Sequence, residues 1–446
     1  MKYFLAGTLT VLTVLSLVAW RIHPRDTNKG KVTLVWTSDD NPARREQIKL
    51  FNRLHPKYNL VLDPNDKNLQ KIIVQCMGGV GADIIDWYLP DDLVRAGVVC
   101  DLTDYLKKSG IDFEKDTWKF SQRCSTYMGR IYAFPTNAAT TAIWFNKDIF
   151  DRAKIPYPKG PWKWEQFIPI AQKLTVRDKN GRVKQFGLLC DYEMWFQFMW
   201  QWGGRTYSED GTRCVVDSPQ AIAAVQFMHD LIYKYRVMPN PAEQKTMATQ
   251  GGWGSGTITL FGAGKGAMAM GGRWWLCLLR DYKDLRMGAV ESPYKYYRAN
   301  FGLSRVSLIN KNSPRKKAAM EFIKFLDSKE YNELINHQAD AVAPVQRYCR
   351  TKKFLHDPAY PKEDFNAVWA DTMNTAKLFE ITPFVSDETT YRTMMKQIDL
   401  VVSDQKSPTD ALKTAARELN AEIQKTIRRD PSLHKEYERV TGKRIE

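Results

Sequence analysis

The stretch of sequence that decides the fold is residues 81–106, which read GADIIDWYLPDDLVRAGVVCDLTDYL. It follows a Gly-rich turn, and the short apolar run from Asp83 to Trp87 has the length and composition of a buried strand. Asp86, Trp87 and Tyr88 stand where that strand ends. The stretch therefore predicts a buried strand whose carboxyl end presents polar and aromatic groups.

The chain before this stretch repeats a strand–helix rhythm. Residues 32–36 predict a strand, and a helix is expected to begin after Asn41-Pro42, a good N-cap and first-turn pair. Residues 58–62 predict the next strand, and residues 69–77 a second helix. Strands separated by helices favour an α/β fold with a mostly parallel sheet covered on both faces. Ligands of such sheets bind at the carboxyl ends of the strands.

Composition excludes several classes of protein. The 446 residues are 43% hydrophobic and 26% charged, which fits two ordinary domains and excludes disorder and a polytopic membrane protein. Lysine and arginine exceed aspartate and glutamate by 66 to 50, so the net charge is +16. Such a charge permits binding to nucleic acid, to anionic lipid or to an acidic ligand, but it does not favour one of these partners over the others.

The first twenty residues predict a targeting segment. Lys2 precedes an apolar run from Tyr3 to Trp20, which is long for a signal-peptide core and marginal for a membrane span. No cysteine stands near its end, and residues 16–19 form only a weak cleavage signal. An uncleaved N-terminal anchor therefore stays open beside a signal peptide. Basic residues after the run argue against simple export, because positive charge tends to stay on the cytoplasmic side of a membrane. The rest of the chain nevertheless favours export.

Motifs for chemistry are absent or weak. The seven cysteines are scattered singly, so a zinc site is not expected and most of them are interpreted as core residues. The sequence contains no GxxxxGK[ST], HExxH or GxSxG. A GxGxxA match at residues 262–267 follows a β-rich segment, TITLF, and is interpreted as a structural turn before a strand. We expect no enzyme activity, no catalytic residues, no metal and no cofactor.

Four blocks of sequence carry a resemblance to a known family. In order along the chain they are residues 81–106, 129–175, 260–276 and 287–331. Together they resemble family 1 of the extracellular solute-binding proteins, the sugar- and oligosaccharide-binding components of bacterial ABC importers. The resemblance implies a two-lobe periplasmic-binding-protein-like α/β fold with an interlobe ligand cleft and a multi-strand hinge.

The resemblance also implies partners, a location and a division of the chain. A carbohydrate ligand and membrane permease subunits are the expected partners, nucleic acid is not expected, and the chain is expected to be a monomer on the extracytoplasmic (periplasmic) side. The division places a signal or anchor at 1–30, lobe 1 at 31–137 and 287–338, and lobe 2 at 138–286 and 339–446.

Candidate ligand contacts are residues at strand ends, because sugar hydroxyls donate to carboxylates while a sugar's apolar face covers an aromatic ring. Trp274 is the first choice, since the family often places a stacking aromatic there, and Arg273 is expected to donate hydrogen bonds to hydroxyls or a carboxylate. The full set is Trp36, Ser38, Asp39, Asp86, Trp87, Tyr88, Asn137, Thr140, Trp195, Trp253, Arg273, Trp274 and Tyr294.

Two other classes of protein remain open at this point. An extracytoplasmic polysaccharide-active enzyme would use carboxylate pairs such as Asp39 with Asp40, and a polyanion-binding surface protein would use the positive charge. The same positive charge leaves open whether the sugar is neutral or acidic, for example a uronate or a sulfated glycan.

Overall fold

The structure is a computed structural model and describes residues 30–65, 68–247 and 256–443. These residues form two compact units. Unit 1 comprises 30–110, 125–134 and 306–331, and unit 2 comprises 111–124, 135–305 and 332–443. Because each unit has its own sheets and its own core, each is described by itself.

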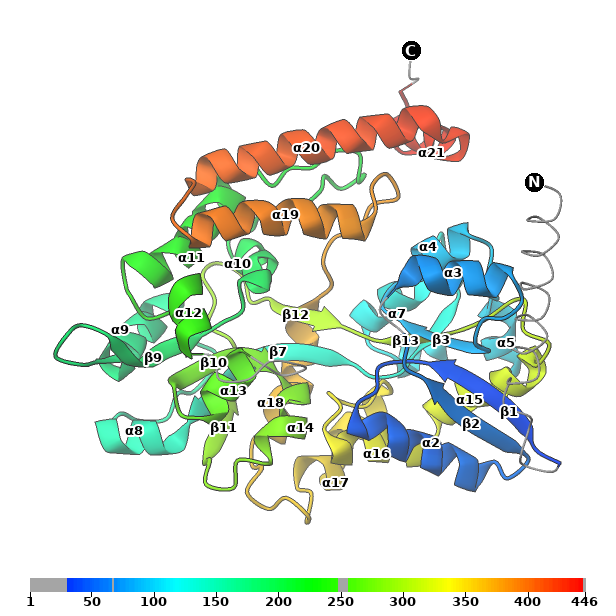
Figure 1. The fold of residues 1–446 in the computed structure, drawn as a ribbon, viewed down its shortest axis with the longest axis horizontal. Helices are drawn as coiled ribbons and strands as arrows, with labels where there is room; N and C mark the ends of the chain where they lie inside the picture. The colour runs from blue at the N-terminus through cyan, green and yellow to red at the C-terminus, as the bar shows by residue number, and fades with distance from the viewer. Residues whose placement is uncertain (1–29, 66–67, 248–255, 444–446) are drawn as a thin grey trace, which may run out of the picture. The chain divides into compact units, whose positions relative to one another are not determined.

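Unit 1 is built on a five-stranded sheet in the order β2-β1-β3-β13-β6 (Figure 1). β1 pairs in parallel with both β2 and β3, and β13 pairs antiparallel to β3. The strands predicted on each side of the first helix are thus confirmed. The strands are β1 (Val32–Thr37), β2 (Tyr58–Asp63), β3 (Ile84–Trp87), β6 (Ala133–Pro135) and β13 (Val306–Ile309), with a separate hairpin of β4 (Thr126–Tyr127) and β5 (Arg130–Ile131).

The helices of unit 1 begin where the sequence predicts. Asn41 caps α2 by accepting a hydrogen bond from the backbone N–H of Arg44, and Asn68 caps α3 in the same way. Phe51 of α2 and Phe322 of α15 pack together at a ring distance of 5.6 Å, whereas α3 lies on the other side of the sheet (Figure 1). The helices are α2 (Pro42–Leu54), α3 (Leu69–Met77), α4 (Asp91–Arg95), α5 (Thr103–Lys108) and α15 (Lys316–Asp327).

Unit 2 is built on a seven-stranded sheet in the order β14-β12-β7-β10-β9-β8, with β11 also pairing with β7. β7 carries a hydrophobic core on each face: Ile143 and Phe145 belong to one core cluster, and Ala142 and Trp144 to the other. The strands are β7 (Ala139–Asn146), β8 (Val176–Arg177), β9 (Val183–Leu189), β10 (Gly266–Gly272), β11 (Met287–Val290), β12 (Asn300–Leu303) and β14 (Ala376–Lys377).

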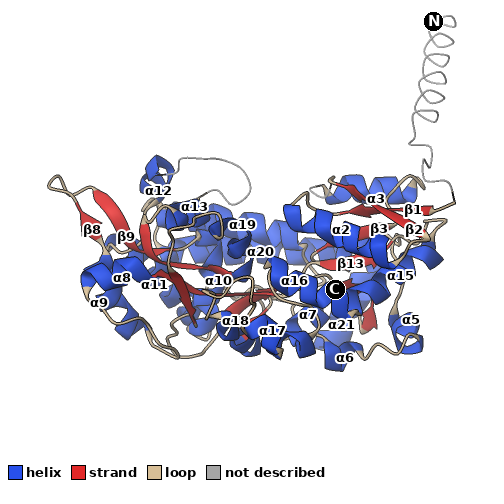
Figure 2. Ribbon diagram, turned by 90° about the horizontal axis from the view of Figure 1, so that it is seen from below, coloured by secondary structure: helices blue, strands red, loops and turns tan. Residues whose placement is uncertain are grey.

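Helices surround the strands of unit 2 (Figure 2). They are α6 (Phe113–Asp116), α7 (Lys119–Ser125), α8 (Lys147–Ala153), α9 (Trp164–Leu174), α10 (Trp195–Gln201), α11 (Pro219–Tyr233), α12 (Pro241–Met247), α13 (Thr257–Gly262), α14 (Leu276–Leu279), α17 (Lys352–Leu355), α18 (Asn366–Thr372), α19 (Asp387–Val402), α20 (Pro408–Arg429) and α21 (Pro431–Thr441), with 3-10 turns η1 (Tyr192–Met194), η2 (Arg273–Trp275), η3 (Gln346–Arg350) and η4 (Met373–Thr375). α16 (Lys329–Gln338) crosses the border of the two units.

The long C-terminal helix, α20, begins at a strong capping signal. Ser407 caps α20, Pro408 occupies its first turn, and α20 packs along α19 (Figure 1). An apolar stripe along α20 is buried, because one face of a 22-residue helix must cover the unit 2 core. Its members are Leu412, Ala416, Leu419, Ile423 and Ile427.

One segment differs from its local propensity. The β-rich segment 257–261 belongs to the helix α13, in which Ile258, Leu260 and Phe261 are buried. Burial against the core therefore overrides the β propensity of the isoleucine and the threonines. The turn at 263–265 and the strand after it, β10, are as expected, so the GxGxxA match is a helix–turn–strand connection.

The units differ in their borders from the division expected from the sequence. Residues 287–305 were expected in the first lobe, but β11 and β12 both pair with β7 of unit 2. Residues 111–124 also pack with unit 2. The expected N-terminal signal or anchor at 1–30 lies, apart from Gly30, outside the described residues.

Candidate functional site

The carboxyl ends of β1 and β3 form an edge of the unit 1 sheet, here called the unit 1 rim. Because Trp36 pairs with Ile84 and Thr37 with Ile85, the next residues of the two strands, Ser38 and Asp86, lie side by side. The Ser38 hydroxyl donates to Asp86 Oδ2 at 2.6 Å, and both residues are completely buried. The sequence prediction that these strand ends meet is thus confirmed in geometry.

A buried arginine organises the unit 1 rim. Arg44, at the start of α2, is fully buried, and its Nε lies 2.9 Å from Asp39 Oδ1 and 3.0 Å from the Ser38 hydroxyl. Its Nη1 donates to Gln47 Oε1 at 3.0 Å. Asn41 donates to the other oxygen of Asp39 at 2.8 Å. The charge of Asp39 is therefore compensated from within the unit.

The aromatic residues predicted at the unit 1 rim have different positions. Trp36 has none of its surface exposed and packs 5.0 Å from the Phe322 ring, so it belongs to the core and offers no area to a ligand in this structure. Trp87 is partly exposed and Tyr88 is 38% exposed, and their rings lie 6.3 Å apart. Together with the part-exposed Asp39, these two rings are the ligand-accessible groups of this rim.

The corresponding edge of unit 2 lies at the carboxyl ends of β9 and β10 and is called the unit 2 rim. These two strands are parallel, with Leu189 paired to Ala269, and β7 begins at the same edge because its Thr141 pairs with Gly272. The residues that follow β9 and β10 are Asp191 to Glu193 and Arg273 to Trp274. Parallel strand ends are where α/β sheets bind ligands.

Trp274 lies at this rim, and the preceding glycines explain its position. A Cβ atom at Gly272 would lie 1.6 Å from the Trp274 ring, and one at Gly271 would lie 2.2 Å from the Trp275 ring. Only residues without side chains allow the two indoles to pack onto the strand end. Trp275 is buried, whereas Trp274 keeps part of its surface exposed, as a stacking residue requires.

Arg273 does not face a ligand as the sequence analysis expected. Its side chain is buried, with Nε donating to Asn366 Oδ1 at 3.0 Å and Nη1 to the carbonyl of Ala341 at 2.8 Å. Its guanidinium also lies 5.0 Å from the centre of the Phe354 ring, and burial lowers the pKa of Arg273 to about 10. The residue ties the strand end to later segments of the unit.

Three rim residues were missed by the sequence analysis. Asp191 and Glu193 follow β9, and Tyr391 reaches the rim from α19, which packs against η1. The Tyr391 hydroxyl donates to Glu193 Oε1 at 2.6 Å, and Tyr391 is 50% exposed. Thr257 donates a hydrogen bond to Asp191. The strand-end rule would have found the two acids, but nothing in the sequence links Tyr391 to them.

Burial and negative charge shift the pKa values of this group. Burial raises the pKa of Asp191, and the Glu193 charge adds to the effect. The pKa of Tyr391 is raised by burial first and then by its hydrogen bond to Glu193. Asp399, also on α19, has a raised pKa for the same reasons, burial and the charge of Glu193. Glu193 thus lies close enough to Asp191 and Asp399 for its charge to raise the pKa values of both.

The remaining predicted residues are placed as follows. Asn137 and Thr140 lie buried where β7 begins, and Asn137 Oδ1 accepts from the Arg305 N–H at 3.2 Å. Trp195, also a candidate ligand contact, begins α10 and is 5% exposed, because it packs in the core of unit 2. Tyr294 lies in the β11–β12 connection, under the Lys163 ammonium at 4.1 Å. Trp253 lies outside the described residues.

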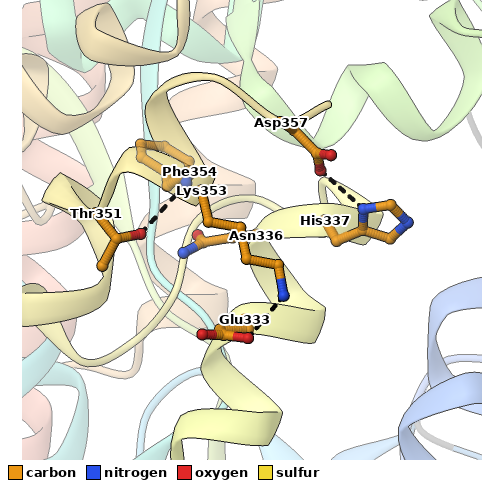
Figure 3. Close-up of a pocket in the computed structure, with 7 residues that line it drawn as sticks. All are labelled: Glu333, Asn336, His337, Thr351, Lys353, Phe354 and Asp357. Carbon is orange, nitrogen blue, oxygen red and sulfur yellow. Dashed lines mark hydrogen bonds and ion pairs between the residues drawn. The ribbon is translucent and has the colours of Figure 1, made fainter. Parts of the chain in front are cut away.

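A separate pocket of unit 2 has no features of a ligand site. It is lined by charged and polar residues that bind one another: His337 contacts Asp357 at 2.7 Å and Lys353 contacts Glu333 at 2.7 Å (Figure 3). Asn336 donates to the carbonyl of Tyr348 and accepts from Ala343. These bonds hold α16 to the following loop. Burial by itself would raise the pKa of Asp357, but the hydrogen bond to His337 helps to bring the pKa below its ordinary value.

Metal and disulfide chemistry find no support in the part of the chain that the structure describes. No group of three His, Cys, Asp or Glu side chains there has the arrangement of a metal site. Five of the seven cysteines are buried, as expected for core residues. No helix within the described residues is long and apolar enough to span a membrane.

Comparison with curated proteins finds distant relatives among binding proteins. A putative binding protein of Brucella abortus is 23% identical over 356 residues, which cover 77% of this chain and 81% of the relative. The sn-glycerol-3-phosphate-binding periplasmic protein UgpB of Agrobacterium fabrum is 24% identical over 58% of this chain and 59% of its own length. An arabinooligosaccharide-binding protein of Halalkalibacterium halodurans is 27% identical over 24% of each chain.

Solved structures show the same fold, and a family model identifies the chain. An ABC substrate-binding protein of Listeria monocytogenes, in complex with cycloalternan, has a TM-score of 0.75 at 22% identity over 88% of this chain and 99% of that one. UgpB of Mycobacterium tuberculosis, in complex with glycerophosphocholine, has a TM-score of 0.73 at 16% identity, covering 89% and 100% of the two chains. The predicted fold class is confirmed. Since the model of the bacterial extracellular solute-binding protein matches residues 36–333, the chain belongs to that family.

Proposed function

We propose that this protein is the extracytoplasmic ligand-binding component of an ABC importer and that it captures a sugar or an oligosaccharide. The observation that carries the proposal is the composition of the two rims in a chain of the solute-binding family. Each rim combines part-exposed aromatic rings with carboxylates at the carboxyl ends of parallel strands: Trp87, Tyr88 and Asp39 in unit 1, and Trp274, Tyr391 and Glu193 in unit 2.

The chemistry of these groups suits a polyol. Carboxylates accept hydrogen bonds from hydroxyls, and the apolar face of a sugar ring covers an indole or phenol ring. No bond is made or broken in such binding. Relatives whose names or complexes state a ligand bind cycloalternan, arabinooligosaccharides or glycerol phosphates, which supports a polyhydroxylated ligand for this chain. Delivery to membrane permease subunits, and export by the segment 1–30, are parts of the same proposal.

Thermal unfolding of the full chain with a panel of saccharides tests the proposal. A ligand at about 100 times its Kd adds about 2.7 kcal/mol to the free energy of unfolding, which a shift in Tm reveals. We expect one class of saccharide to raise the Tm and to be recovered intact. A saccharide recovered cleaved would indicate an enzyme, and shifts from every polyanion that vanish at high salt would indicate a polyanion-binding protein.

A further inference from the structure

The acids of the unit 2 rim have no cationic partner in the described part of the chain. Among the residues that the structure describes, Asp191, Glu193 and Asp399 form no ion pair, and the first two accept hydrogen bonds from the neutral hydroxyls of Thr257 and Tyr391. The segment 248–255, which precedes Thr257 in the sequence, contains no lysine or arginine.

The basic residues closest in sequence do not alter this balance. Arg273 is buried, and its donors are directed to Asn366 and the Ala341 carbonyl. Arg392 and Lys396 are exposed on α19, the helix that carries Tyr391 and Asp399, but neither forms an ion pair with an acid of the rim in the described residues. The raised pKa values of Asp191 and Asp399 agree with this geometry.

We infer that the part of the ligand bound at the unit 2 rim carries no negative charge, so that the substrate class is an uncharged or aminated saccharide and not a phosphorylated, sulfated or uronic one. An anionic group placed among these carboxylates is repelled, whereas hydroxyl and ammonium groups donate to them. The inference rests on the proposed function.

The test uses matched saccharides that differ only in charge. Isothermal titration of the full chain compares glucose, galactose and maltotriose with their amino, uronic and phosphate forms. We expect the tightest binder to lack an acidic group and its acidic counterpart to bind at least about tenfold more weakly. Glu193→Gln, which keeps an oxygen for the Tyr391 hydroxyl, should reduce that discrimination. Glu209→Gln, which removes the same charge from a side chain that is 89% exposed, should leave it unchanged.

Each outcome bears on one of the two proposals. An acidic member that binds most tightly, or a discrimination that Glu193→Gln leaves as it was, overturns the inference while carbohydrate capture stands. If no member binds, the proposed function has failed for these saccharides, and the inference that rests on it is withdrawn with it.

Discussion

The two rims occupy the same topological position, but they differ in the partners of their carboxylates. At the unit 1 rim, Asp39 is paired with the buried Arg44, and Asp86 accepts from the Ser38 hydroxyl. At the unit 2 rim, Asp191 and Glu193 accept only from neutral hydroxyls among the described residues. A carboxylate that is paired with a cation is held in place by its partner. A carboxylate without a cationic partner remains available to accept hydrogen bonds from a ligand. The comparison assigns a structural role to Arg44, which holds the part-exposed Asp39 in place, and a recognition role to the acids of the unit 2 rim.

The largest expected effect is on the unit 1 network. Arg44→Met should lower the free energy of unfolding by about 3 kcal/mol, because it leaves Asp39 unpaired and removes donors to Ser38 and Gln47. Urea unfolding of the full chain measures the change. Arg45→Met is the matched control on the same helix: its partner is the exposed Asp40, and it should cost less than about 1 kcal/mol. Equal costs for the two variants would contradict a structural role for the network.

The second prediction concerns the indole of the unit 2 rim. Trp274→Ala should weaken binding of the saccharide found by titration by about 1–3 kcal/mol, the range of a single aromatic hot spot. Tyr157→Ala serves as control, because Tyr157 is 36% exposed and follows α8, which begins where β7 ends, opposite to the rim. An unchanged Kd in a folded Trp274→Ala variant would remove this residue from the site.

Much of the fold could be predicted from sequence because local signals and burial agree in it. The caps Asn41, Asn68 and Ser407 mark helix starts, and the apolar stripe of α20 marks its buried face. Where the two conflict, burial decides, as it does in α13. The pairing of β11 and β12 with β7 is a long-range choice for which the sequence of these strands holds no local signal.

The candidate site was predictable only in part. The strand-end rule finds the loops after β1, β3 and β10, and it applies equally to Asp191 and Glu193 after β9. It does not tell which side chains at a strand end turn inward. Trp36 and Arg273 are residue types that suit a sugar site, but neither faces a ligand. Trp36 packs against Phe322, and Arg273 donates a hydrogen bond to Asn366, and both partners are far away in the sequence.

A smaller effect sharpens the role of Tyr391. Tyr391→Phe keeps the ring and removes the hydroxyl that donates to Glu193, so we expect binding to weaken by about 1 kcal/mol, the worth of one hydrogen bond. Tyr157→Phe is a matched control, since the Tyr157 hydroxyl donates to Asp151 at 2.7 Å in an exposed pair. The two variants are compared by titration with the same saccharide. An equal effect, or none, in both would place Tyr391 outside the recognition surface.

The smallest effect tests the charge of the unit 2 rim without any ligand. Burial raises the pKa of Asp191, so the folded chain binds a proton more readily than the unfolded chain between the ordinary pKa of about 3.9 and the raised value. This acid therefore costs stability as pH rises through that window, and Asp191→Asn should be more stable than the native chain above it. The gain should disappear as the pH falls below about 3.9.

Asp101 of unit 1 supplies the opposite sign for comparison. Burial by itself would raise its pKa, but hydrogen bonds from Thr103 and Arg130 bring the pKa below the ordinary value. Its contribution to stability is present above the ordinary pKa and is lost as the pH falls through the lowered one. Asp101→Asn should accordingly be less stable than the native chain at neutral pH, with a difference that narrows on acidification. Calorimetric Tm values between pH 3 and about pH 7 measure both variants, and differences of the same sign would mean that the unit 2 rim is compensated after all.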